Sequence, residues 1–87
     1  MNQSQGSKLE RNEIRRFEVD GVELTSGSCL EVLLGGVWVP GRVEYMHPMG
    51  DYAFITTSGE DFETYVALWA GMIARLPARR QAGRLLP

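Results

Sequence analysis

The stretch CLEVLLGGVWVPGRVEYM, residues 29–46, decides the fold of this chain. Residues 29–34 are almost all apolar, and residues 37–46 alternate between two faces, which is the period of a β-strand. The Gly-Gly pair at 35–36 provides a tight turn between them. We therefore predict a β-hairpin. The face of its second strand that we assign to the core carries Val37, Val39, Gly41, Val43 and Tyr45.

Further strands follow on either side of this hairpin. Asp20 and Gly21 separate two alternating segments, residues 15–19 and 22–24. An Asp-Gly pair in that position favours a second hairpin, because both turn residues need positive φ. Three more strand-like segments are bounded by turns and cover residues 51–57, 62–68 and 72–76. Short strands joined by short turns predict an antiparallel meander.

Pro40 and Gly41 lie in the middle of the longest predicted strand. Proline donates no hydrogen bond to a ladder, so this part of the strand should face an edge or a bulge. Glycine beside it permits a sharp bend. A bent sheet of short strands closes into a barrel, which removes exposed edges. We therefore predict an all-β fold, a small barrel of five to six short antiparallel strands with flexible termini.

Three segments resemble a known fold family. Residues 28–32 (SCLEV) and 36–43 (GVWVPGRV) resemble the opening of an SH3-like barrel of the Tudor or KOW kind. Residues 66–77 (VALWAGMIARLP) resemble its last turn and strand. The whole also resembles a small uncharacterised bacterial family that is often carried on phages and mobile elements. This resemblance implies an SH3-like β-barrel and no catalytic residues.

The pattern and the resemblance together divide the chain into three parts. We expect a flexible N-terminal tail at 1–14, the SH3-like barrel at 15–77 and a basic C-terminal tail at 78–87. The 87 residues allow one domain, and the single cysteine, Cys29, excludes an internal disulfide. No apolar run reaches the roughly 18 residues of a membrane span, and the N-terminus is too polar for a signal peptide. We expect a cytoplasmic protein that does not bind membranes.

The charge of the chain is divided between its centre and its ends. Residues 17–74 carry nine carboxylates against one cationic side chain, Arg42, a net charge of −8. The segments before and after carry +2 and +4, so the whole chain carries −2. An acidic centre repels phosphate backbones and favours cationic partners. A solvated face that keeps the barrel soluble explains the same charges.

We predict a non-catalytic module whose acidic barrel binds a protein with a basic surface. In its sharper form it is a phage- or plasmid-encoded inhibitor of a host nuclease or defence complex, similar in action to anti-CRISPR proteins. Five aromatic residues fall opposite the predicted core faces: Trp38, Tyr52, Phe54, Tyr65 and Trp69. The predicted partner-binding residues are Trp38, Glu31, Glu44, Tyr52, Glu60, Asp61 and Glu63.

The sequence also allows a second function and bears on catalysis, cofactors and oligomeric state. The alternative function is a nucleic-acid-associated accessory module that binds through Arg42, Arg79, Arg80 and Arg84. An enzyme is not expected, because nothing in the sequence brings the single histidine, His47, to Cys29 as a nucleophile pair. We expect no cofactor, and no metal, because no ligand set has suitable spacing. A homodimer through an exposed strand edge is left open.

Overall fold

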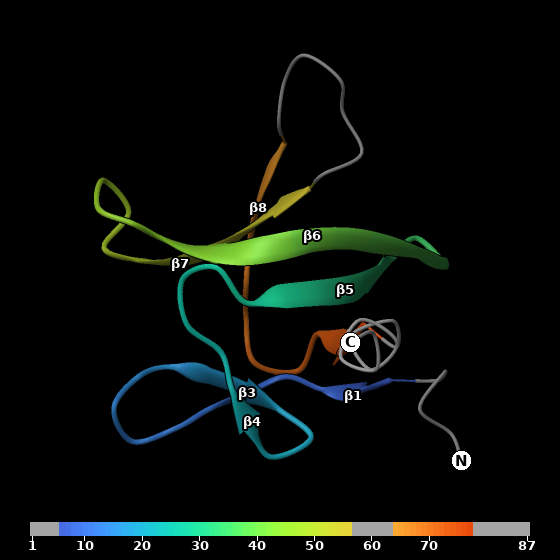
Figure 1. Cartoon of the computed structure of the whole chain (residues 1–87), viewed down its shortest axis with the longest axis horizontal. Coiled ribbons are helices and arrows are strands. Elements are labelled where there is room, and N and C mark those ends of the chain that lie inside the picture. Colours follow the sequence, from blue (N-terminus) through green and yellow to red (C-terminus); the bar gives the residue numbers. More distant parts are fainter. Residues whose placement is uncertain (1–5, 57–63, 78–87) are drawn as a thin grey trace, which may run out of the picture.

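The protein folds into two β-sheets that share one core (Figure 1). The computed structural model describes residues 6–56 and 64–77, and every regular element in them is a strand. The larger sheet has the antiparallel order β1 (Ser7–Lys8), β9 (Ile73–Arg75), β5 (Cys29–Leu34), β6 (Val37–Met46), β7 (Asp51–Thr56), β8 (Tyr65–Ala67). The smaller sheet has the antiparallel order β2 (Glu10–Arg11), β3 (Phe17–Val19), β4 (Val22–Glu23). The prediction of an all-β fold is confirmed. Nowhere in these two ranges does a helix have the length and apolar character to cross a membrane.

Two tight turns fix the registers of the predicted hairpins. Gly35 and Gly36 adopt positive φ values of 59° and 82° between β5 and β6. Asp20 and Gly21, with φ values of 54° and 79°, connect β3 and β4 in the same way. Two-residue loops with positive φ match the natural twist of the strands that they join. Both hairpins expected from the sequence are therefore confirmed.

Gly41 marks the point where β6 changes neighbours. β6 pairs with β5 along its first part and with β7 along its last, and the ladder to β7 begins at Gly41, immediately after Pro40. This position is consistent with the inability of proline to donate to a ladder. Gly41 is buried, and a Cβ atom there would lie 2.6 Å from Cζ of Phe54. The glycine therefore provides the room that the Phe54 ring occupies.

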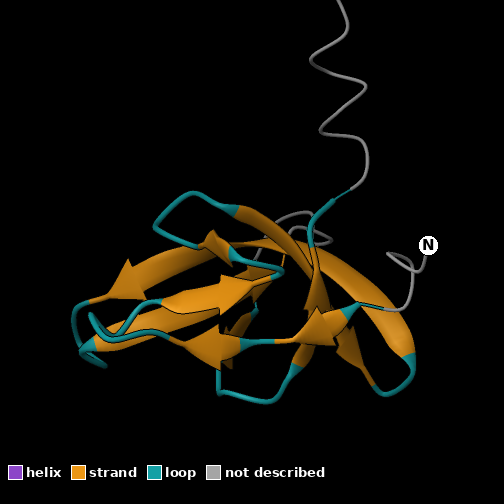
Figure 2. Cartoon of the chain, turned by 90° about the horizontal axis from the view of Figure 1, so that it is seen from below, coloured by secondary structure: helices purple, strands orange, loops and turns teal. Residues whose placement is uncertain are grey.

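Apolar side chains from both sheets meet in one core, around which the strands curve (Figure 2). On β6 only the central part faces this core: Val43 is buried, whereas Val37 is 60% exposed and Tyr45 is 39% exposed. The predicted core face is thus right in the middle of β6 and wrong at its ends, which extend past the core. The prediction that Phe54 faces away from the core is wrong, because Phe54 lies opposite Val43 and is fully buried. The core side chains are Leu9, Phe17, Val19, Leu24, Leu30, Val32, Val43, Phe54, Leu68, Met72 and Ala74.

The predicted N-terminal tail at 1–14 is corrected by the structure. From residue 7 onward the chain is part of both sheets, as β1 and then β2, and Leu9 between them is buried. The Leu9 N–H donates to the Met72 carbonyl at 2.7 Å, and its own carbonyl accepts from the Gly71 N–H at 2.8 Å. The fold therefore has nine strands in the described residues instead of five to six. Residues 1–5 and the predicted C-terminal tail at 78–87 lie outside the described residues.

Truncating Leu9 to alanine is expected to lower the free energy of unfolding by about 2–3 kcal/mol, because removing most of a buried side chain between the two sheets would leave a cavity. Urea denaturation of Leu9→Ala beside the wild type measures this difference. Ile14→Ala is the matched control, because Ile14 is 62% exposed and its loss should cost less than about 0.5 kcal/mol. Equal stability of the two variants would show that the N-terminal strand is dispensable.

Candidate binding surfaces

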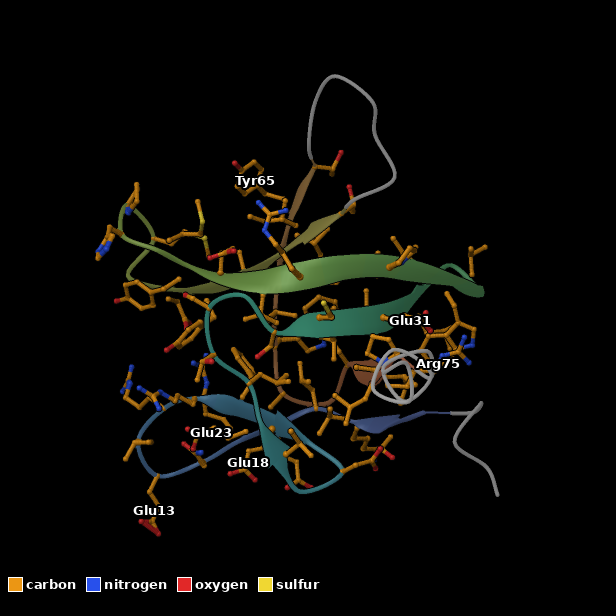
Figure 3. All side chains as sticks on the ribbon, in the orientation of Figure 1. Glu13, Glu18, Glu23, Glu31, Tyr65 and Arg75 are labelled. Carbon is orange, nitrogen blue, oxygen red and sulfur yellow. The ribbon has the colours of Figure 1, made fainter. Side chains whose placement is uncertain are left out.

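Two of the predicted partner-binding residues, Glu31 and Trp38, lie together and already hold a cation. The Arg75 guanidinium lies 4.0 Å from the centre of the Trp38 ring, and its Nε donates to Oε1 of Glu31 at 2.5 Å. Glu31 and Arg75 face each other in the β5–β9 ladder, and Figure 3 shows both at one end of the sheet. The cross-strand register therefore satisfies the carboxylate and the aromatic face from within the protein.

The other predicted site residues do not join this cluster. Glu44 accepts a hydrogen bond from Nε of Arg42 at 2.9 Å, so the structure pairs a predicted protein-binding acid with a predicted phosphate-binding arginine. Tyr52 contacts a separate group of aromatic rings at the far end of β7. Among the described residues the predicted acidic patch is therefore not assembled. Six predicted site residues lie outside the described residues: Glu60, Asp61, Glu63, Arg79, Arg80 and Arg84.

A different set of acids forms a row across the small sheet. Glu10 of β2 lies directly opposite Glu18 of β3, and Glu18 lies directly opposite Glu23 of β4. We call these three residues the acid row. Figure 3 shows Glu18 and Glu23 side by side on the side of the small sheet that faces away from the larger one, with Glu13 below them. Like charges directly opposite in neighbouring strands are destabilising, so the row costs the fold free energy.

Hydrogen bonds hold two members of the acid row in place. The Asn12 side-chain amide donates to Oε2 of Glu18 at 2.9 Å and to Oε1 of Glu23 at 3.0 Å. The Asn12 amide oxygen in turn accepts from the Arg16 backbone N–H at 3.0 Å. NH1 of Arg16 donates to Oε2 of Glu23 at 2.8 Å, and this hydrogen bond is the main cause of the lowered pKa of Glu23. Within the described residues, Glu10 and Glu18 form no ion pair.

An ion pair between Arg11 and Asp51 connects the two sheets. NH1 and NH2 of Arg11 donate to the two carboxylate oxygens of Asp51 at 2.8 and 2.9 Å. The same guanidinium lies 3.9 Å from the centre of the Phe17 ring. Its hydrogen bonds are the main cause of the lowered pKa of Asp51, which Arg15 lowers further by its charge. This bidentate pair fixes the position of the turn that follows β6 against the loop that follows β2.

Replacing Asp51 by asparagine is expected to lower the free energy of unfolding by about 1 kcal/mol at pH 7, since the pair is partly exposed. The folded-state pKa of Asp51 is lowered, so its stabilisation is present above about pH 4 and is lost as the pH falls through the folded pKa. Urea denaturation of Asp51→Asn and wild type at pH 7 and about pH 2.5 should therefore show a smaller difference at the lower pH. A difference of the same size at both values would contradict this role.

Three aromatic rings form a strip at the end of the molecule that carries the Arg11–Asp51 pair. Tyr45 packs edge-to-face on Tyr52 and on His47, with ring centres 5.1 Å apart in each case. Tyr52 lies near Arg16, whose pKa is raised mainly by its hydrogen bond to Glu23 and further by Tyr52. We call Tyr45, His47 and Tyr52 the aromatic strip. Tyr45 and His47 are exposed, so the strip presents ring surface to solvent.

The residues that could carry chemistry are separated in this structure. His47 packs on Tyr45, whereas Cys29 is an exposed thiol that lies opposite Arg42 in the β5–β6 ladder. In residues 6–56 and 64–77, no three histidine, cysteine or carboxylate side chains lie close enough to hold a metal ion. The expectation of a non-catalytic protein stays a prediction.

A family model for a domain of unknown function, DUF5348, matches residues 7–75. The chain belongs to this family. The DUF5348 match begins at the first residue of β1 and ends at the last residue of β9, so the family domain takes in all nine strands, including the N-terminal ones. The resemblance to a small uncharacterised family is confirmed in this form. No curated protein and no solved structure shows significant similarity to this DUF5348 domain.

Proposed function

We propose that this protein is a non-catalytic module that binds a basic surface of a partner protein through the acid row. The observation that supports this proposal is the direct opposition of Glu10, Glu18 and Glu23 across three strands. Glu13 and Asp20 lie on the loops at the two ends of β3 and extend the negative charge. The proposal keeps the partner class expected from the sequence and moves the contact surface to the small sheet.

The ion pairs formed by acids elsewhere in the protein support this choice of surface. Glu31, Glu44 and Asp51 each bind one of the protein's own arginines, so their charge is already compensated. Among residues 6–56 and 64–77, Glu23 is the one member of the acid row with such a partner, Arg16. A cationic partner would relieve the repulsion between the row's carboxylates on binding, and complementary charge also accelerates association.

We propose a more specific fold family and class of partner as well. We also propose that the domain is an SH3-like barrel, because β9, in the segment that resembles the last strand of such a barrel, pairs with β5, in the segment that resembles its opening. In this form the protein comes from a phage, plasmid or other mobile element, and its carboxylates take the place of phosphates in the basic groove of a host nuclease or defence complex. The mechanism is occlusion without covalent chemistry.

Affinity capture from a lysate of the native host tests the proposal. The wild type should retain a protein with a basic surface, and the triple variant E10Q/E18Q/E23Q should lose it. The matched control is E60Q/D61N/E63Q, which removes the same charge from the site expected on sequence grounds. Retention by the first variant and loss by the second would place the contact at residues 60–63 and overturn the proposal. Capture of acidic partners alone would overturn it as well.

A further inference from the structure

The aromatic strip lies beside the most cationic part of the described chain. The loop between β2 and β3 and the turn between β6 and β7 lie at the same end of the molecule (Figure 1). The Arg11–Asp51 pair connects their bases, and Asp51 directly precedes Tyr52 of the strip in β7. The rings and the arginines of these two segments therefore lie at one end of the molecule.

One arginine at this end forms no ion pair within the described part of the chain. Arg11 is neutralised by Asp51, and Arg16 is neutralised by Glu23. Arg15 is exposed and forms no ion pair with any residue in 6–56 or 64–77. It lies close enough to Asp51 to affect the pKa of that carboxyl. Arg15 thus supplies a positive charge near the strip, in a loop that also carries the acid Glu13.

The backbone of the loop holds Arg15 in an unfavourable conformation. Its φ is 69°, in the left-handed region that costs a non-glycine residue about 1–2 kcal/mol. The Arg15 N–H donates to the Asn12 carbonyl at 2.9 Å, and its carbonyl accepts from NH1 of Arg11 at 3.1 Å. These contacts fix the backbone from which the exposed Arg15 side chain extends.

We infer that the aromatic strip binds single-stranded nucleic acid, with an unpaired base stacked on Tyr45 or His47 and its phosphate held by Arg15. Exposed rings stack on any unpaired base, because every base has a π-face, and a neighbouring cation binds the backbone. A base pair inside a duplex presents no free face to these rings. The acid row on the adjoining sheet repels a strand that extends across it, so the site suits one or two nucleotides. This surface differs from the one expected from Arg42 and the C-terminal arginines.

Fluorescence anisotropy with a dye-labelled oligothymidine of about eight nucleotides, in about 30 mM salt, tests the inference. The wild type should bind the single strand and should bind a duplex of the same length more weakly. Tyr45→Ala should weaken binding roughly 5- to 100-fold, whereas Tyr45→Phe should bind as the wild type does. Arg15→Gln should weaken binding and reduce its dependence on salt. Trp69→Ala is the matched control, because it removes a ring that is 55% exposed elsewhere on the surface.

Three outcomes would overturn the inference. One is the absence of single-strand binding by the wild type at low salt. The second is equal affinity of the wild type and Tyr45→Ala, with both folded by circular dichroism. The third is binding that survives Tyr45→Ala and disappears in R79Q/R80Q/R84Q, which would place the contact on the C-terminal arginines. None of these outcomes depends on the acid row, so the proposed protein partner is tested separately.

Discussion

Gly41→Ala is expected to lower the free energy of unfolding by about 4 kcal/mol, a large share of the stability of a domain of this size. The new Cβ would meet the Phe54 ring at 2.6 Å and, closer still, the backbone carbonyl of Ile55 on the neighbouring strand. A backbone atom in the middle of a ladder has no room to move away. Thermal unfolding followed by circular dichroism should show a fall in Tm of about 15–30 °C.

Gly36→Ala is the matched control for this prediction. Gly36 has a φ of 82°, and an added Cβ there meets no atom within 4 Å. The substitution should therefore cost only the strain of a left-handed alanine, about 1 kcal/mol. Comparing Gly41→Ala with Gly36→Ala separates the cost of a steric clash from the cost of placing alanine in the left-handed region. A Gly41→Ala protein as stable as Gly36→Ala would show that the contact between β6 and β7 is looser than described.

The second large effect is expected on binding. Removing the three charges of E10Q/E18Q/E23Q should weaken the affinity for the captured partner about 10- to 100-fold, because each exposed ion pair contributes about 0.5–1 kcal/mol. The stability of this variant should stay within about 1 kcal/mol of the wild type, since the repulsion removed across three strands offsets the loss of the exposed Arg16–Glu23 pair. Isothermal calorimetry and urea denaturation of the same samples measure the two quantities.

This combination of effects distinguishes a binding surface from a structural one. An acid row that stabilised the fold would lose stability and affinity together in the variant. In the wild type, affinity should also fall as salt is raised, because exposed charges are screened. Affinity that does not change with salt, or a variant with full affinity, would contradict the assignment.

Local sequence rules predict the two hairpins because two-residue turns leave no freedom of register. Once Asp20 and Gly21 form the turn, Glu18 must lie opposite Glu23, so part of the acid row is implied by the sequence. The remaining part, Glu10, lies on a two-residue strand that is too short to show any alternation. Leu9 is the single apolar residue that indicates this strand, and one residue carries no periodicity.

The Glu31–Arg75 and Arg11–Asp51 ion pairs could not be predicted because they join residues far apart in the chain. Arg75 reaches Glu31 only because β9 returns to pair with β5, and Arg11 reaches Asp51 across the boundary between the sheets. Counting charges along the sequence therefore overestimates the open negative surface of the central segment. The burial of Phe54 is a similar case, since the register of β7 against β6 decides which of its faces is inward.

The position of the contact surface is the central claim, and an NMR titration tests it most directly. Amide shifts of the isotope-labelled protein are recorded as the captured partner is added in about 100 mM salt. We expect the largest changes on β2, β3 and β4, around Glu10, Glu18 and Glu23. Changes concentrated instead around Glu31 and Trp38 on β5 and β6, with the small sheet unaffected, would contradict the account.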